Sequence, residues 1–203
     1  MDKVQFVKGD ALHPEDYRGL LSGCTAVVHS IGILTETSAI LERVLPQWPS
    51  ARQQTSPRAS APTYDSAIYQ STKVLLAEAE AAHVESFLYI SASEPPPYTM
   101  RGFIAAKRKA DEVVLASQRL RPIVFRPSLI YGPDRWFTTP LSTLFSFLQR
   151  VGVQGPADTP LAGTTVGRAA VNAIQDRSVR GLYLAPDIAR LAEANTPPSD
   201  PKS

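Results

Sequence analysis

The sequence predicts an α/β fold in which helices cover both faces of a parallel sheet. Three short, apolar, β-branched runs alternate with segments of helical periodicity, and Gly, Ser and Pro cluster between them. Parallel strands need crossover connections, and right-handed crossovers place helices on the faces of the sheet. The length of 203 residues indicates one domain, and the single cysteine excludes an intramolecular disulfide framework.

Each element follows from local periodicity and from the turn residues that bound it. Alternating or fully apolar runs predict strands at 4–6, 25–32, 87–91, 122–127 and 181–184. Spacings of three and four predict helices at 14–21, 64–83, 101–120, 136–150 and 164–176, with a last helical turn at 187–192.

Two segments interrupt this alternation. The stretch 46–63 holds four prolines among Gln, Ser, Ala and Arg, so we expect a disordered insertion within a domain spanning 1–192. The polar residues 193–203 predict a disordered tail.

Composition and motifs exclude several function classes. With 21 basic and 19 acidic residues the net charge is only +2, which predicts no nucleic-acid partner. No apolar run approaches the roughly 20 residues of a transmembrane helix, and residues 1–7 do not resemble a targeting peptide. Neither CxxC nor HExxH occurs, so no metal site is expected, and neither GxGxxG nor a Walker motif is present.

Candidate ligand-binding residues follow the predicted strands, because ligands of open parallel sheets bind beyond the carboxyl ends of the strands. The alternative interpretation is structural, since a serine at a strand end often caps a turn and a glycine relieves a bend. The candidates are His29, Ser30, Gly32, Ser91, Ser93, Arg126, Pro127 and Ser128.

Lys107 lies on the apolar face of the predicted helix 101–120. A lysine there must reach a ligand, a carboxylate or a water channel, because a buried unpaired ammonium is costly. The alternative is a buried stem whose head reaches water and pairs with Asp111. Arg108 and Lys109 are expected to point elsewhere, on a solvated helix with i,i+4 ion pairs.

Several motifs together resemble the extended and atypical short-chain dehydrogenase/reductases, an NAD(P)-binding superfamily that includes epimerase-like proteins. The resemblance covers 4–191 and is closest to fungal mitochondrial proteins associated with coenzyme Q biosynthesis, which are relatives of the nucleotide-binding accessory subunit of respiratory complex I. The motifs that carry it are Lys8-Gly9-Asp10, the strands at 27–32 and 87–92, the helix with Lys107, Arg126-Pro127, and Tyr131-Gly132-Pro133.

The resemblance implies a Rossmann-like parallel sheet and an NAD or NADP site. It places Ser30, Gly32, Lys107 and Pro127 on the nicotinamide side of the cofactor. It also implies Ser91 or Ser93 as the serine that orients a substrate carbonyl, and Lys107 as a catalytic residue.

The sequence departs from the family at the catalytic tyrosine. Where the family has Tyr-x-x-x-Lys, this chain has Phe103 four residues before Lys107, so the phenol that would exchange a proton is missing. Tyr98 lies off the helix register and is an unsuitable replacement.

The second departure is at the amino-terminal end. In the family, a first strand, a glycine-rich turn, a first helix and a second strand precede the equivalent of Val4, and this chain begins after them. We expect a sheet that lacks this first βαβ portion, a weakened cofactor site, and an exposed edge at the strand 25–32. We therefore expect that the chain is truncated at its amino terminus. We also expect that copies of the chain associate through that edge.

The expected function is that of a nucleotide-binding structural or regulatory factor in mitochondrial ubiquinone biosynthesis or respiratory assembly. The resemblance implies the mitochondrial matrix, or the matrix face of the inner membrane, and partners in a mitochondrial protein complex. Two alternatives stay open: an active NAD(P)-dependent oxidoreductase or isomerase acting on a quinone precursor, and a truncated fragment that only binds other proteins.

Overall fold

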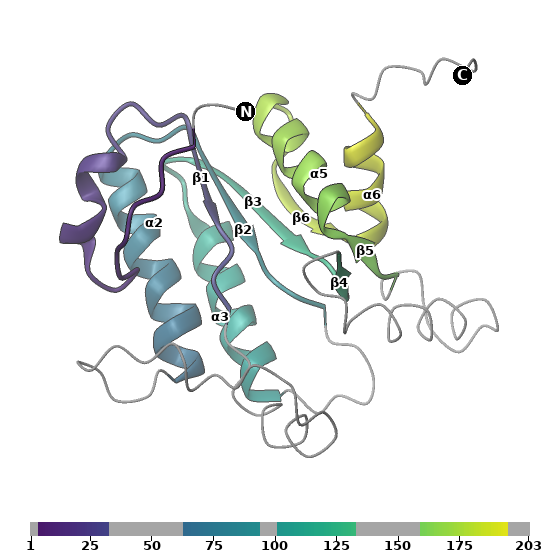
Figure 1. Cartoon of the computed structure of the whole chain (residues 1–203), viewed down its shortest axis with the longest axis horizontal. Helices are drawn as coiled ribbons and strands as arrows, with labels where there is room; N and C mark the ends of the chain where they lie inside the picture. The colour runs from purple at the N-terminus through teal and green to yellow at the C-terminus, as the bar shows by residue number, and fades with distance from the viewer. Residues whose placement is uncertain (1–3, 33–62, 94–100, 133–158, 195–203) are drawn as a thin grey trace.

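The computed structural model describes residues 4–32, 63–93, 101–132 and 159–194. Two 3₁₀ turns, η1 and η2, precede the first strand, and a π-helical turn, η4, leads into the first long helix (Figure 1). The elements are η1 (Pro14–Asp16), η2 (Arg18–Leu20), β1 (Ala26–His29), η4 (Asp65–Gln70), α2 (Ser71–Ala81), β2 (Ser86–Ile90), α3 (Arg101–Ala116), β3 (Arg121–Arg126), β4 (Ile130–Tyr131), β5 (Leu161–Ala162), α5 (Gly163–Gln175), β6 (Gly181–Leu184) and α6 (Ala185–Glu193).

Four strands form a parallel sheet in the order β1-β2-β3-β6. The register places Val28 beside Leu88, and Leu88 beside Ile123. Two further hydrogen bonds extend the β2–β3 ladder beyond the strand ends, from the amide of Ser91 to the carbonyl of Phe125 and from that of Ser93 to Pro127. The predicted α/β fold with a parallel sheet is confirmed.

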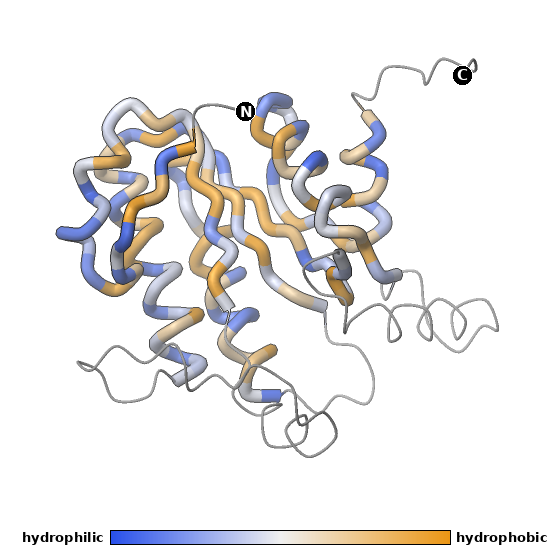
Figure 2. The backbone as a smooth tube through the Cα atoms, viewed as in Figure 1, coloured by the Kyte–Doolittle hydropathy of each residue, from blue (hydrophilic) through white to orange (hydrophobic). Residues whose placement is uncertain are grey.

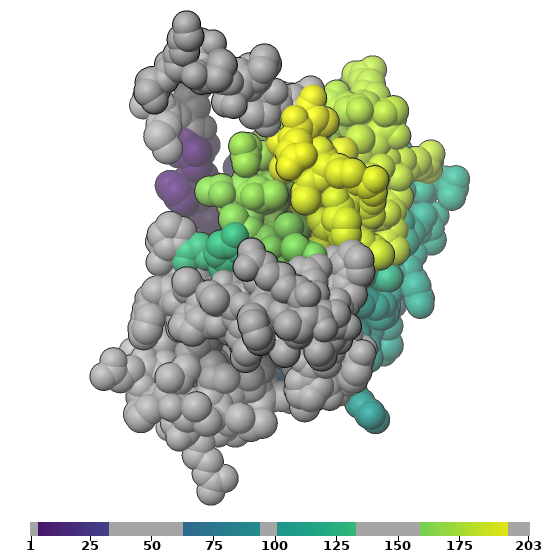
Figure 3. Space-filling view, turned by 90° about the vertical axis from the view of Figure 1, so that its right-hand side faces the viewer, coloured from purple at the N-terminus to yellow at the C-terminus, as the bar shows by residue number. Residues whose placement is uncertain are grey.

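The core has two layers, one on each face of the sheet, because successive side chains of a strand point to opposite faces. Phe87, Tyr89 and Val124 pack with α2 and α3 on one face. Leu88, Ile123 and Phe125 pack with α5 and α6 on the other. Figure 2 shows the apolar strands between the helices, and Figure 3 shows the outer side of α5 and α6.

The expected strand at 4–6 is wrong. Residues 4–10 form no strand, and their apolar side chains are exposed, with Val4 at 75% and Phe6 at 93%. Alternation alone does not hold a strand, which needs a paired backbone and a buried face. In the described part of the chain β1 pairs with β2 alone, so the expected sheet edge at β1 is present.

Several element boundaries also differ from the expectation. The predicted helix 14–21 is a pair of 3₁₀ turns, and the expected last turn at 187–192 is a longer helix, α6, which begins with Ala185 and Pro186. Proline is well accommodated in the first turn of a helix, since its missing N–H has no partner there. The predicted helix 136–150, most of the insertion at 46–63 and most of the tail at 193–203 lie outside the described residues.

The small pair β4–β5 was not expected from the sequence. It brings residues 130–131, which follow β3, beside residues 161–162, which precede α5. In the described ranges no helix combines the length and apolar character that crossing a bilayer requires.

Candidate functional site

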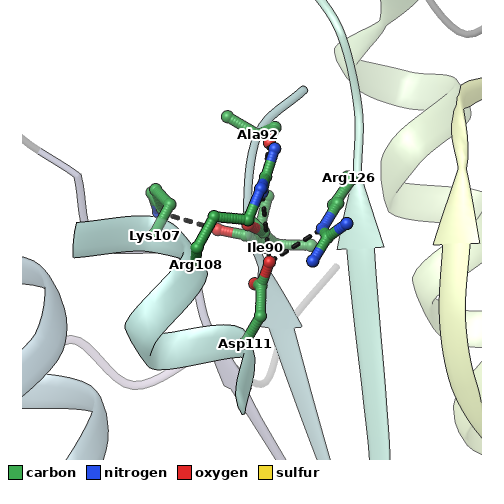
Figure 4. A network of polar contacts seen from close by, with 7 residues as sticks. Ile90, Ala92, Lys107, Arg108, Asp111 and Arg126 are labelled. Atoms are coloured by element: carbon green, nitrogen blue, oxygen red, sulfur yellow. Dashed lines mark hydrogen bonds and ion pairs between the residues drawn. The ribbon is translucent and has the colours of Figure 1, made fainter. Parts of the chain in front are cut away.

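The candidate site lies at the carboxyl ends of β1, β2 and β3, where helix α3 passes the sheet (Figure 4). Lys107 is 3% exposed and projects from α3 toward two strand ends. Its Nζ donates hydrogen bonds to the carbonyl oxygens of Ile31, at 3.1 Å, and Ile90, at 2.9 Å. The expectation that Lys107 lies on the inner face of its helix is confirmed.

The ammonium group of Lys107 also lies over two aromatic rings. Nζ is 4.8 Å from the ring centroid of Tyr89 and 5.8 Å from that of Phe103. Burial lowers the pKa of Lys107 to about 8, and the carboxylate of Asp111 opposes that shift. The lysine makes no ion pair with Asp111 among the described residues, so the suggested pairing with this carboxylate is wrong.

Gly32 lies against the same lysine. A Cβ atom at this position would be 3.7 Å from Lys107 Nζ and 3.8 Å from a ring carbon of Phe103, which is ordinary van der Waals contact. The structure thus brings together Gly32, Lys107 and Phe103, which are far apart in the sequence. Ser30, also predicted on the nicotinamide side, is exposed just after β1.

Phe103 fills the position at which the resemblance expects a tyrosine. Its ring is 8% exposed and packs edge-on against Tyr64, with ring centroids 5.9 Å apart. Tyr89 places its ring beneath Lys107, but it is fully buried, and burial raises the pKa of its phenol. This phenol therefore cannot supply the accessible, acidic proton that the family's tyrosine supplies. Tyr98 lies outside the described residues.

His29 ends β1 and is 1% exposed. Its Nδ1 accepts the backbone N–H of Ile31 at 3.3 Å, so the proton of a neutral ring lies on Nε2. Nε2 faces the hydroxyl oxygens of Ser71, at 3.3 Å, and Thr72, at 3.5 Å. Burial, together with the positive charge of Lys107, lowers the pKa of His29 to about 4.

This arrangement excludes a serine nucleophile activated by His29. Ser71 Oγ donates to the carbonyl oxygen of Ala67 at 2.6 Å, and Nε2 of the histidine already carries the ring proton. A general base must have a free nitrogen facing the hydroxyl that it deprotonates. His29 therefore links the end of β1 to the hydroxyl groups of Ser71 and Thr72 at the start of α2.

A second polar cluster surrounds Asp111, which is 1% exposed. Its Oδ2 accepts hydrogen bonds from Arg126 Nε at 2.7 Å and from Arg108 Nη1 at 3.1 Å. Arg108 Nη1 also donates to the carbonyl oxygen of Ala92 at 2.9 Å. The expectations that Arg108 points away from the sheet and that Asp111 belongs to a solvated face are therefore wrong.

Of the two candidate serines, Ser91 contacts this cluster. Ser91 is 5% exposed, with its Oγ 3.5 Å from Arg108 Nη1. The backbone N–H of Ser93 donates a hydrogen bond to the carbonyl oxygen of Pro127, which is buried. One sequence signal could have identified Asp111, namely its position four residues after Lys107 on the same helix face. Nothing in the sequence pointed to its pairing with Arg126.

No protein-family model matches the chain. MIOREX complex component 2 of Saccharomyces cerevisiae is 31% identical over 173 residues, which cover 73% of this chain and 62% of that protein. Sterol-4-alpha-carboxylate 3-dehydrogenase of Candida albicans is 28% identical over 152 residues, covering 64% of this chain and 37% of that enzyme. The chain thus spans less than two thirds of the length of both curated relatives.

Solved structures show the same fold. A short-chain dehydrogenase/reductase superfamily protein from Agrobacterium tumefaciens with bound NAD has a TM-score of 0.55 and 14% identity, covering 92% of this chain and 68% of that one. MoeE5 in complex with UDP-glucose and NAD also has a TM-score of 0.55, with 15% identity, and covers 93% of this chain and 68% of that one. The chain therefore has a Rossmann-like α/β fold, as these solved short-chain dehydrogenase/reductase and epimerase-type structures do, and it is a distant homologue of MIOREX complex component 2.

Proposed function

We propose that this chain is a nucleotide-binding protein of the short-chain dehydrogenase/reductase type with a structural or regulatory role. The observation that carries the proposal is Phe103, which fills the tyrosine position, packs in the core and has no proton to exchange. Lys107 keeps its place one turn later on α3. A site of this kind can bind a nucleotide without the phenol that catalysis in the family requires.

The residues around Lys107 fit the ribose of a nicotinamide nucleotide. An ammonium group has three N–H donors, and two of them are used on the carbonyl oxygens of Ile31 and Ile90. The third can donate to a ribose hydroxyl, beside the exposed backbone of Gly32. Ser30 and Pro127 are proposed to line the same side, with Ser91 or Ser93 nearer to a substrate. A nicotinamide ring, when bound, supplies hydride transfer.

Two observations support membership of a protein assembly. The homologous protein of Saccharomyces cerevisiae is named as a component of the MIOREX complex. β1 pairs with β2 on one side, and in the described part of the chain no strand pairs with its other side. We therefore propose a mitochondrial location and a role in a respiratory or related assembly, with a copy of the chain as a further partner at this edge. The ubiquinone part of the prediction rests on the sequence resemblance, and neither curated relative above is named for it.

Thermal unfolding of the whole chain with and without NADH or NADPH tests nucleotide binding. A ligand that binds only the folded state at about 100 times its Kd adds about 2.7 kcal/mol, which raises the Tm of a chain of this size by roughly 5–10 °C. Lys107→Met should remove the rise, whereas the exposed Lys73→Met should keep it. An unchanged Tm at millimolar NADH and NADPH would contradict the proposal.

A second experiment separates binding from catalysis. We expect no oxidation of NADH or NADPH by the wild-type chain with small carbonyl substrates, because Phe103 cannot protonate an alkoxide. Phe103→Tyr restores a phenol one turn from Lys107 and should create measurable turnover if the rest of the site is intact. Wild-type turnover that Lys107→Ala abolishes would instead show an active oxidoreductase or isomerase.

A further inference from the structure

The network at the ends of β2 and β3 contains more positive than negative charge. Asp111 is the one carboxylate that the described residues contribute to it, and two guanidinium groups share its Oδ2 atom. Lys107 adds a third cation on the same helix and reaches the end of β2 through Ile90. Figure 4 shows Arg108 and Arg126 converging on Asp111 from α3 and β3. The four charged groups carry a net charge of +2.

The two guanidinium groups are accessible, unlike the carboxylate that they share. The side chains of Arg108 and Arg126 are 30% and 22% exposed, against 1% for Asp111. Each guanidinium group uses only some of its five N–H donors in hydrogen bonds to the described residues. Arg126 donates through Nε, and Arg108 donates through Nη1. As far as the described residues go, donors therefore remain on both side chains at the edge where open parallel sheets bind ligands.

A buried hydroxyl belongs to the same strand end, one residue after Ala92. Ser93 Oγ is buried and makes no hydrogen bond within the described ranges. The backbone of this serine is held by Pro127, the residue after Arg126, and Arg108 bonds the carbonyl of Ala92, the residue before it. A buried hydroxyl without a partner is unfavourable, and a ligand oxygen beside it would satisfy it.

We propose that Arg108, Arg126 and Ser93 form a binding site for a small anion, a carboxylate or phosphate group, at the carboxyl ends of β2 and β3. Guanidinium groups bind both anions through paired, charge-assisted hydrogen bonds. An anion at this position compensates the excess positive charge that Asp111 leaves, and it accepts a hydrogen bond from the Ser93 hydroxyl. Lys107 contributes only its charge to this site, since the donors proposed for the anion are Arg108, Arg126 and Ser93, whereas the nucleotide contact uses an N–H of Lys107 itself.

Isothermal titration of the whole chain with inorganic phosphate and with succinate, at constant ionic strength, tests the site. We expect saturable binding of at least one anion. Arg108→Gln should weaken it at least about tenfold, as expected for the loss of a charge-assisted pair. Arg108→Lys should give an intermediate affinity, since lysine keeps the charge without the planar fork. Arg119→Gln removes an exposed arginine of the same helix-to-strand region and should leave the affinity unchanged.

Phosphate binding alone would assign a phosphoryl ligand, succinate binding alone would assign a carboxylate, and both would support the site. Absence of saturable binding by either anion would overturn it, as would equal weakening by Arg119→Gln and Arg108→Gln. Circular dichroism confirms that each variant is folded. The rise of Tm with NADH should be the same in Arg108→Gln and in the wild type, so failure of nucleotide binding and failure of anion binding are distinguished.

Discussion

Arg121 at the start of β3 joins the sheet to the end of α5. Its Nη1 lies 2.8 Å from the carbonyl oxygens of Ala173 and Asp176 and 2.7 Å from that of Val179. Its Nη2 donates to the carbonyl oxygen of Ile174 at 2.7 Å. A positive group is favourable at a helix C-terminus, where the last carbonyl groups have no partner within the helix.

We predict that Arg121→Met lowers the free energy of unfolding by about 2–4 kcal/mol. Two nitrogens can direct about three well-aligned N–H groups at these carbonyls, and a hydrogen bond to a charged group contributes roughly 1.5–3 kcal/mol. Water replaces part of each bond at this half-buried position, so the loss is well below the sum. Arg121→Lys should recover less than half, because an ammonium cannot span the carbonyl oxygens as a planar fork does.

Urea denaturation followed by circular dichroism measures this loss. The matched control is Arg119→Met, two residues earlier, because Arg119 is exposed and makes no hydrogen bond or ion pair within the described residues. Its effect should stay within about 0.5 kcal/mol, as for ordinary surface substitutions. Equal losses for the two variants would refute the assignment of Arg121 as the residue that holds the end of α5.

Three further predictions concern buried and exposed charges. The pKa of Lys107 is 10.5 in an unfolded chain and about 8 in the folded chain. The unfolded state therefore binds more protons between pH 8 and pH 10.5, and the free energy of unfolding of the wild type should rise by up to about 3 kcal/mol across that range relative to Lys107→Met. Urea denaturation at several pH values measures this rise. Folding lowers the pKa of His29 from 6.5 to about 4, so the free energy of unfolding should decrease as the pH drops from 6.5 to 4. His29→Gln should flatten this part of the plot of stability against pH. A pH dependence that is unchanged in the variant would contradict a buried neutral ring. Arg18 and Glu78 form an exposed two-point ion pair, so Arg18→Ala should lower the Tm slightly at low salt and not at high salt.

The sheet was predictable from the sequence because its strands are short and buried on both faces. Parallel strands of this kind read as continuous apolar runs, and the runs at 87–91 and 122–127 match β2 and β3 to within one residue. The strand 181–184 coincides with β6. The inner position of Lys107 followed from helical spacing alone, because a residue's face on a helix depends only on its register.

Other features depend on contacts between distant segments, which periodicity does not encode. Residues 4–6 alternate like a strand, yet they form none, because a strand also needs a paired backbone. Arg108 and Asp111 are charged and adjacent to Lys109 and Glu112, so local sequence suggests a solvated face. Asp111 is instead buried and accepts a hydrogen bond from Arg126, which lies on β3. The roles of Ser91 and Ser93 stay predictions for the same reason, since they depend on a bound ligand.

The contacts of Lys107 explain how the site keeps its shape without the family's tyrosine. The ammonium is held by carbonyl groups at the ends of both β1 and β2, and by the faces of two aromatic rings, so its position does not depend on a phenol oxygen. Phe103 supplies one of those rings and completes the core beside Tyr64. Loss of the phenolic oxygen thus removes the proton donor while leaving the lysine, the strand ends and the packing in place. The proposed nucleotide binding can therefore be tested apart from catalysis, and Phe103→Tyr is the variant that tests catalysis.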